Sequence, residues 1–145
     1  MFDQNAIANS PDEWMKLARS YAKVAETLVE NKELCFHAWR NAGFAVECSV
    51  KAVIMFHHRW NKWPEKSEMP GVYVHDLAKL VRVAQIVLDP LHPTAPSWHT
   101  AMHWNRTQSY NPQNMPRKMA RSMLAAATGN NGVIPWLATT YQLAF

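Results

Sequence analysis

Apolar residues recur every three or four positions along most of this chain, which is the spacing of one face of an α-helix. The clearest example runs from Leu34 to about Lys62. Its apolar stripe consists of Phe36, Trp39, Gly43, Val46, Val50, Val53 and His57. Beside it lies a stripe of small residues, namely Cys35, Ala38, Ala42, Ala45, Ser49 and Ala52. The polar side carries Arg40, Glu47, Lys51 and His58. Two packing faces and one polar face, open to solvent or a ligand, predict the central helix of a bundle.

The segment before this helix has a strong helix start. Ser10 is a capping residue, Pro11 occupies the first helical position, and Glu13 is placed to return the capping hydrogen bond. We therefore predict a helix from Ser10 to about Glu30, preceded by a loose tail over residues 1–9. The connection at 31–33 is so short that the first two helices should form an antiparallel hairpin.

The rest of the chain also reads as helices joined by irregular segments. Pro70 and Gly71 are placed for a type II turn in the loop at 64–74. Asp76 can cap the helix that follows. Further helices are predicted at residues 77–89, 98–110, 114–127 and 133–141. No segment alternates with period two for long enough to predict a strand, so we expect an all-α, up-and-down bundle of four to five helices, with residues 10–145 as one domain.

Composition is consistent with a globular protein. The chain has 145 residues, 48% of them apolar and seven of them Trp. No apolar run reaches the roughly 18 residues that a membrane helix needs, so we expect a cytoplasmic protein without a membrane segment. Cys35 and Cys48 lie thirteen positions apart on one predicted helix, a separation of roughly 20 Å at about 1.5 Å per residue. They cannot form an intrachain disulfide, so both should be reduced.

The net charge of +4 is unevenly distributed. All eleven acidic residues lie at or before Asp89, where eleven Lys and Arg residues balance them. The last third has no acid and carries Arg106, Arg117, Lys118 and Arg121. Such a surface could attract phosphates or an acidic partner, although ordinary solubilising charge explains it equally well. The basic and aromatic run at 57–63 likewise fits either charges at a helix end or a platform for single-stranded nucleic acid.

The candidate chemistry centres on Glu47. Glu47 and Lys51 are four residues apart, in the favourable order for a helical ion pair. If other helices cover them, Glu47 needs a further cation, and we predict that Arg106 supplies it. His99 and His103 have the spacing of two metal ligands, but no third ligand accompanies them. No glycine-rich phosphate loop is present, so neither a metal nor a cofactor is predicted.

The segment from Ala42 to Ala52, AGFAVECSVKA, resembles the second-helix signature of HEPN domains, a family named for nucleotide binding in higher eukaryotes and prokaryotes. Two later segments follow in the family's order: His75, Asp76 and Leu77 with Leu80, then Trp104, Arg106, Tyr110 and Pro112. The resemblance implies a HEPN-like bundle of four or five helices and frequent homodimerisation. It also implies a role in nucleotide or RNA chemistry, in toxin–antitoxin pairs or in defence.

Many HEPN domains are metal-independent ribonucleases that use an Arg followed, after four to six residues, by a His. Arg106 occupies the position of that Arg, but the three positions available for the His hold Asn111, Pro112 and Gln113. No histidine follows His103, and no other arginine has a His at this spacing. The usual ribonuclease motif is therefore missing, which argues against an enzyme.

The leading hypothesis is a non-nucleolytic HEPN-like homodimer that binds a nucleotide, RNA or a nucleotidyltransferase-type protein partner. Its predicted ligand-binding residues are Glu47, Lys51, His75, Arg106 and Tyr110. One alternative is a divergent metal-independent ribonuclease that uses Arg106 with Tyr110, or with His99 or His103 from either subunit. The other is a structural or protein-interaction bundle, in which Glu47 and Arg106 only fix the helices.

Overall fold

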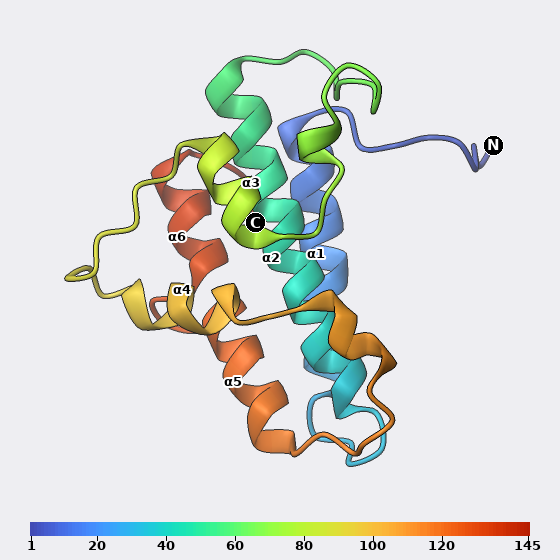
Figure 1. Ribbon diagram of the computed structural model, residues 1–145, viewed down its shortest axis with the longest axis vertical. Helices are drawn as coiled ribbons and strands as arrows, with labels where there is room; N and C mark the ends of the chain where they lie inside the picture. Colours follow the sequence, from blue (N-terminus) through green and yellow to red (C-terminus); the bar gives the residue numbers. More distant parts are fainter.

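The computed structural model describes all 145 residues, and its regular secondary structure is all helical, as predicted (Figure 1). The α-helices are α1 (Pro11–Leu28), α2 (Cys35–His58), α3 (Leu77–Ala84), α4 (Ala95–Met102), α5 (Arg117–Thr128) and α6 (Val133–Thr140). Two short 3-10 helices are η1 (Pro70–Val72) and η2 (Arg106–Tyr110). No helix is both long enough and apolar enough to span a membrane.

Helices α1 and α2 form the predicted antiparallel hairpin, and they lie side by side over most of their length (Figure 1). The Ser10 hydroxyl accepts a hydrogen bond from the Glu13 amide at 3.1 Å and caps α1. The Glu13 side chain does not return this bond, so only half of the predicted capping box is formed. At the connection, the Asn31 side chain accepts hydrogen bonds from the amides of Glu33 and Leu34.

Helix α2 is the central element. It packs against α1, α3, α5 and α6, and every residue from Ala45 to Met55 is buried. This run includes two members of the predicted polar side: Glu47 is only 5% exposed and Lys51 only 7%. The polar side of α2 is therefore covered by other segments at this level. The prediction of a central helix is confirmed.

Two predicted helices end earlier in the structure than the sequence pattern indicated. Helix α2 stops at Arg59, which is left-handed with a φ of 55°, and the Trp60 amide turns back to the Met55 carbonyl. Helix α3 stops at Gln85, with a φ of 54°, instead of continuing to Asp89. Left-handed residues of this kind end helices, and non-glycine residues adopt this conformation at a cost that tertiary packing must offset.

Two further local predictions were wrong. A type II turn at Pro70 and Gly71 would require a positive φ at the glycine, but no glycine in the chain has one; instead, Pro70 begins η1. The single helix predicted at 98–110 is divided into α4 and η2. The division places the Trp104 indole against Gly43, where a Cβ atom would lie only 1.9 Å from the ring. Gly43 thus permits a close approach between α2 and the segment that leads to η2.

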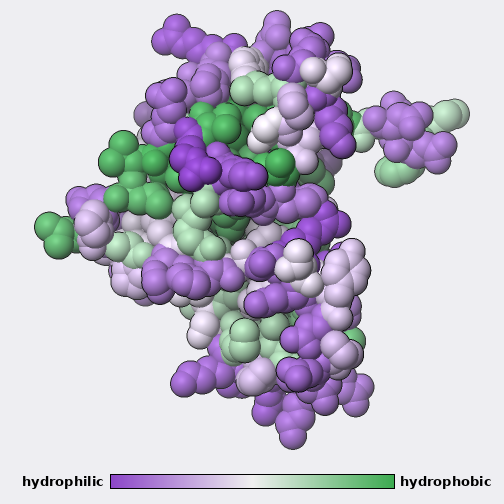
Figure 2. All heavy atoms as spheres, in the orientation of Figure 1, coloured by the Kyte–Doolittle hydropathy of each residue, from purple (hydrophilic) through white to green (hydrophobic).

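The surface includes one exposed apolar region. The loop between α3 and α4 projects from the left of the bundle in Figure 1, and apolar groups gather on that flank in Figure 2. Val87 is 84% exposed and Leu91 is 92% exposed.

Candidate functional site

Glu47 is the anchor of a buried polar cluster on α2. Its Oε2 atom accepts a hydrogen bond from the Lys51 Nζ at 3.1 Å, one helical turn away. Its Oε1 atom lies 2.7 Å from the His75 Nδ1. The Lys51 ammonium also lies 5.2 Å from the centre of the Trp14 ring. A buried carboxylate is stable only when its charge and its lone pairs are satisfied, and these contacts satisfy both.

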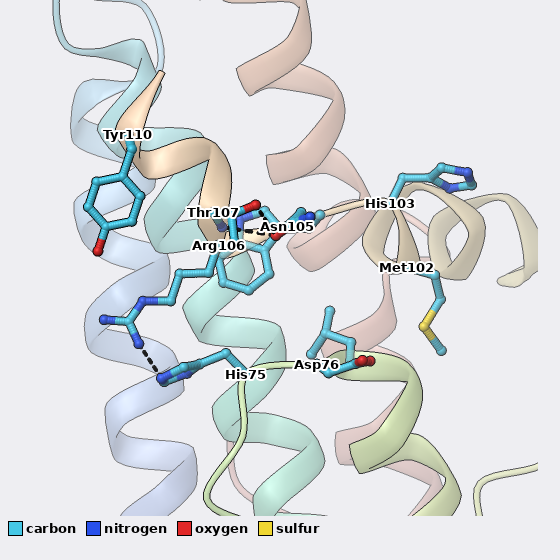
Figure 3. Close-up of a pocket in the computed structure, with 10 residues that line it drawn as sticks. His75, Asp76, Met102, His103, Asn105, Arg106, Thr107 and Tyr110 are labelled. Atoms are coloured by element: carbon cyan, nitrogen blue, oxygen red, sulfur yellow. Dashed lines mark hydrogen bonds between the residues drawn. The ribbon is translucent and has the colours of Figure 1, made fainter. Parts of the chain in front are cut away.

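His75 connects this buried pair to the surface. It precedes Asp76, the N-cap of α3, whose side chain accepts a hydrogen bond from the Lys79 amide and fixes the start of that helix. Because the Glu47 carboxylate can only accept, the His75 Nδ1 must carry a hydrogen and donate it. Its Nε2 then has a free lone pair when the ring is neutral. The Arg106 guanidinium, which can only donate, contacts this Nε2 atom (Figure 3).

The direct pair predicted between Glu47 and Arg106 is therefore wrong, because His75 lies between them. Arg106 begins η2, which contains no buried residue, whereas Glu47 projects from the interior of α2. The His75 side chain is 42% exposed and connects the buried Glu47 to the exposed Arg106. The sequence pattern placed the three residues in one cluster, but it gave no information on the order in which they connect.

A cleft of about 670 Å³ opens on the outer side of His75, between the start of α3 and the segment from Met102 to Tyr110. Arg106 crosses it toward His75, and Tyr110 lies on the same side (Figure 3). Tyr110 is 88% exposed. Three of the five predicted site residues, His75, Arg106 and Tyr110, thus line one cleft. Glu47 and Lys51 do not line it.

The sequence pattern did not predict the aromatic cluster of Phe44 and Trp104 beside this cleft. The Phe44 ring lies 5.5 Å from the Trp104 ring and 5.6 Å from the guanidinium carbon of Arg106. The centre of the Phe44 ring also lies 5.5 Å from the centre of the Tyr21 ring and 5.4 Å from the guanidinium carbon of Arg40. The available signal was the series 40, 44, 47 and 51, which follows one face of α2.

Two nearby groups are unsuited to nucleophilic chemistry. Burial, followed by the negative charge of Glu47, raises the pKa of the Cys48 thiol to about 12. Burial is also the main cause that raises the pKa of the Tyr21 hydroxyl, with Cys48 and Glu47 adding to it. Both groups therefore stay protonated at neutral pH, and only thiolates and phenolates are effective nucleophiles.

The other candidate clusters are not assembled into sites. The His103 ring points away from Arg106 (Figure 3), and its Nδ1 lies 2.7 Å from the His99 carbonyl. No group of three His, Cys, Asp or Glu side chains is placed to hold a metal. In the predicted 57–63 platform, Trp63 is buried against Trp14, with ring centres 4.8 Å apart, and is not free for stacking.

The basic residues of the last third are also separated. Arg121 forms a two-pronged ion pair with Glu30, and Arg117 donates to the Glu30 carbonyl. These two arginines therefore tie α5 to the end of α1 and leave Arg106 as the cation at the cleft.

Comparisons with models of protein families, with curated proteins and with solved structures find no match to this chain.

Proposed function

We propose that the cleft at His75, Arg106 and Tyr110 binds the phosphate of a nucleotide or of RNA, within a bundle of HEPN-like type. The observation that carries this proposal is the state of Arg106. Its guanidinium reaches into the cleft and has no carboxylate partner, because Glu47 is occupied by Lys51 and His75. A planar guanidinium is the group that best matches phosphate oxygens, to which it donates two parallel hydrogen bonds.

Other groups at the cleft are suited to the remaining parts of a nucleotide. The exposed Tyr110 offers a hydroxyl donor and a ring face for a base. The turn that carries Arg106 is fixed by Asn105, whose side chain accepts hydrogen bonds from the amide and the hydroxyl of Thr107. The guanidinium is therefore presented from a defined backbone position. The predicted homodimer and nucleotidyltransferase-type partner stay predictions; light scattering tests the first against the 16.6 kDa of one chain.

Ribonuclease activity is the second candidate, and the Glu47–His75 contact favours it. A carboxylate on Nδ1 orients the imidazole so that Nε2 faces the cleft, where it can accept a proton once the Arg106 guanidinium shifts from it to the phosphate. His75 would take the proton of a ribose 2′-hydroxyl, whose oxygen would attack the adjacent phosphorus. The bond to the 5′-oxygen would break, leaving a 2′,3′-cyclic phosphate, and the imidazolium would return its proton to that oxygen. Arg106 would stabilise the negative charge on the phosphate.

A binding assay with a matched control tests the main proposal. Fluorescence anisotropy with labelled single-stranded RNA, and calorimetry with nucleotides, would compare the wild type, Arg106→Gln and Arg82→Gln. Arg82 is an exposed cation outside the cleft that forms no ion pair. We expect Arg106→Gln to weaken binding about tenfold or more, the value of one charge-assisted hydrogen bond, and Arg82→Gln to change it less than about threefold. Equal effects of the two variants would refute the proposal.

The same samples distinguish binding from cleavage. Incubation with RNA in EDTA, followed by end-group analysis, would detect cyclic phosphate products. Cleavage by the wild type that is lost in His75→Gln, with RNA affinity retained, would establish the ribonuclease candidate. Intact RNA, together with measurable RNA affinity of the wild type, would establish binding without cleavage.

A further inference from the structure

Two arginines from distant parts of the chain converge on the same aromatic ring. Arg40 comes from the first half of α2 and Arg106 from the start of η2. Their guanidinium carbons lie 5.4 Å and 5.6 Å from the centre of the Phe44 ring. The two carbons can be no further apart than the sum of these distances.

Neither arginine has an acidic partner. The three ion pairs of the structure are Lys51–Glu47, His75–Glu47 and Arg121–Glu30. Glu47 is the only buried acid, and both of its oxygens are already in use. Arg40 is half-buried, and its Nε atom is shielded from solvent with no hydrogen-bond partner. A buried donor that lacks an acceptor is costly, and the terminal N–H groups of Arg40, which are not shielded in this way, also have no protein acceptor and are available to an incoming anion.

Contact with Phe44 alone does not account for this arrangement. A cation above an aromatic ring gains little at exposed sites and gives its N–H donors no acceptor; Arg106 donates only to His75, and Arg40 donates to no protein group. A guanidinium that stacks on a ring keeps its N–H groups in its own plane, so they stay available to a ligand. Phe44 therefore contacts both guanidinium groups and keeps them within reach of one extended ligand.

Arg40 does not line the cleft that contains Arg106. A ligand that contacts both arginines must therefore extend beyond the cleft to Arg40. A single phosphate in the cleft would satisfy Arg106, whereas a ligand with a second anionic group further along would also satisfy Arg40. The geometry thus favours a ligand with two anionic groups in succession.

We propose that Arg40 is a second phosphate contact and that the site selects ligands with two neighbouring phosphate groups over ligands with one. This inference rests on the proposed phosphate-binding function. A nucleoside diphosphate or triphosphate carries such groups, and so do successive phosphodiesters of an RNA strand. Both sources present the same chemistry to Arg40 and Arg106.

Calorimetry with inorganic phosphate and pyrophosphate tests this directly, because neither probe has a base. Wild type should bind pyrophosphate at least about tenfold more tightly than phosphate, the value of one additional charge-assisted hydrogen bond. Arg40→Gln should remove most of this preference and leave phosphate affinity within about twofold. Arg106→Gln should lower the affinity for both probes. Arg40→Lys, which retains the charge and most of the packing, should give an intermediate preference, and circular dichroism would verify that each variant is folded.

The outcomes separate this inference from the function on which it rests. If Arg106→Gln weakens both probes while Arg40→Gln binds pyrophosphate like the wild type, the second contact is refuted and the proposed function stands. If the wild type binds neither probe, both are refuted. If the preference for pyrophosphate depends on Arg40, two further comparisons identify the kind of ligand. The affinity for ADP is compared with that for AMP, and the affinity for a trinucleotide with that for a dinucleotide. A gain with ADP indicates a nucleotide ligand, and a gain with the trinucleotide indicates RNA.

Discussion

Replacing Glu47 by Gln should destabilise the protein far more than a typical charge substitution. Glu47 and Lys51 are 5% and 7% exposed, so solvent screens their interaction weakly. The substitution leaves the Lys51 ammonium buried, with an amide oxygen and the nearby tryptophan rings as its remaining contacts. Breaking a buried ion pair in this way costs about 3–5 kcal/mol.

We expect a loss near 3 kcal/mol, at the lower end of that range, because the Gln oxygen can still accept one hydrogen bond from Lys51 or His75. For a chain of this size, such a loss lowers Tm by roughly 10 °C. The double variant Glu47→Leu with Lys51→Met removes both charges together. Its free energy of unfolding should lie within about 1 kcal/mol of the wild-type value, since well-packed apolar residues often replace buried ion pairs without loss of stability.

Urea unfolding followed by far-UV circular dichroism measures the free energy of unfolding of the wild type, Glu47→Gln, Glu47→Leu, Lys51→Met and the double variant. The wild type, Glu47→Leu, Lys51→Met and the double variant form a double-mutant cycle, and the coupling energy between the two positions should be at least about 2 kcal/mol. A Glu47→Gln variant within about 0.5 kcal/mol of the wild type would refute the reasoning. So would a double variant that loses the sum of the two single losses, because the two charges would then act independently.

Three other predictions follow from local contacts. Gly43→Ala should cost about 1–3 kcal/mol despite the better helix propensity of Ala, because its Cβ would displace Trp104; chemical denaturation and Trp fluorescence would detect it. Cys48, with a pKa of about 12, should react with a thiol reagent at pH 8 only after unfolding, and rapid labelling of the native protein would contradict its burial. The hydrogen bond from Arg121 lowers the pKa of the Glu30 carboxyl below its ordinary value of 4.5. The Glu30–Arg121 pair therefore stabilises the protein above pH 4.5, and this stabilisation is lost as the pH falls through the lowered pKa. NMR titration should show the pKa of Glu30 rising in Arg121→Gln, and the stability difference between the two proteins should vanish in acid.

The helices of the hairpin could be predicted because their signals are local. The Ser10 cap, the three-four spacing and the four-residue interval between Glu47 and Lys51 all depend on neighbours in sequence. His75 reaches Glu47 only because residues 59–76 follow a particular path, fixed in part by the Tyr73 hydroxyl donating to the Pro64 carbonyl at 2.6 Å. No periodicity encodes that path.

The break between α4 and η2 shows the same limit. Residues 98–110 contain no glycine or proline, so the pattern indicated one helix. The chain instead turns at 103–105, and the Trp104 indole fills the space above Gly43. The large apolar ring gains more from this distant contact than the segment would gain from one more helical turn. The same turn moves Arg106 toward His75, which explains why the predicted ion pair was replaced by a chain of three residues.

The 3-10 helix η2 supplies Arg106 but contributes no buried residue to the bundle. Substitutions at its other positions should therefore leave the folding equilibrium nearly untouched while altering what the cleft accepts. In the proposed function, η2 contributes to ligand contact without contributing to the core, so changes at its surface positions could alter the preferred ligand at little risk to the structure of the bundle.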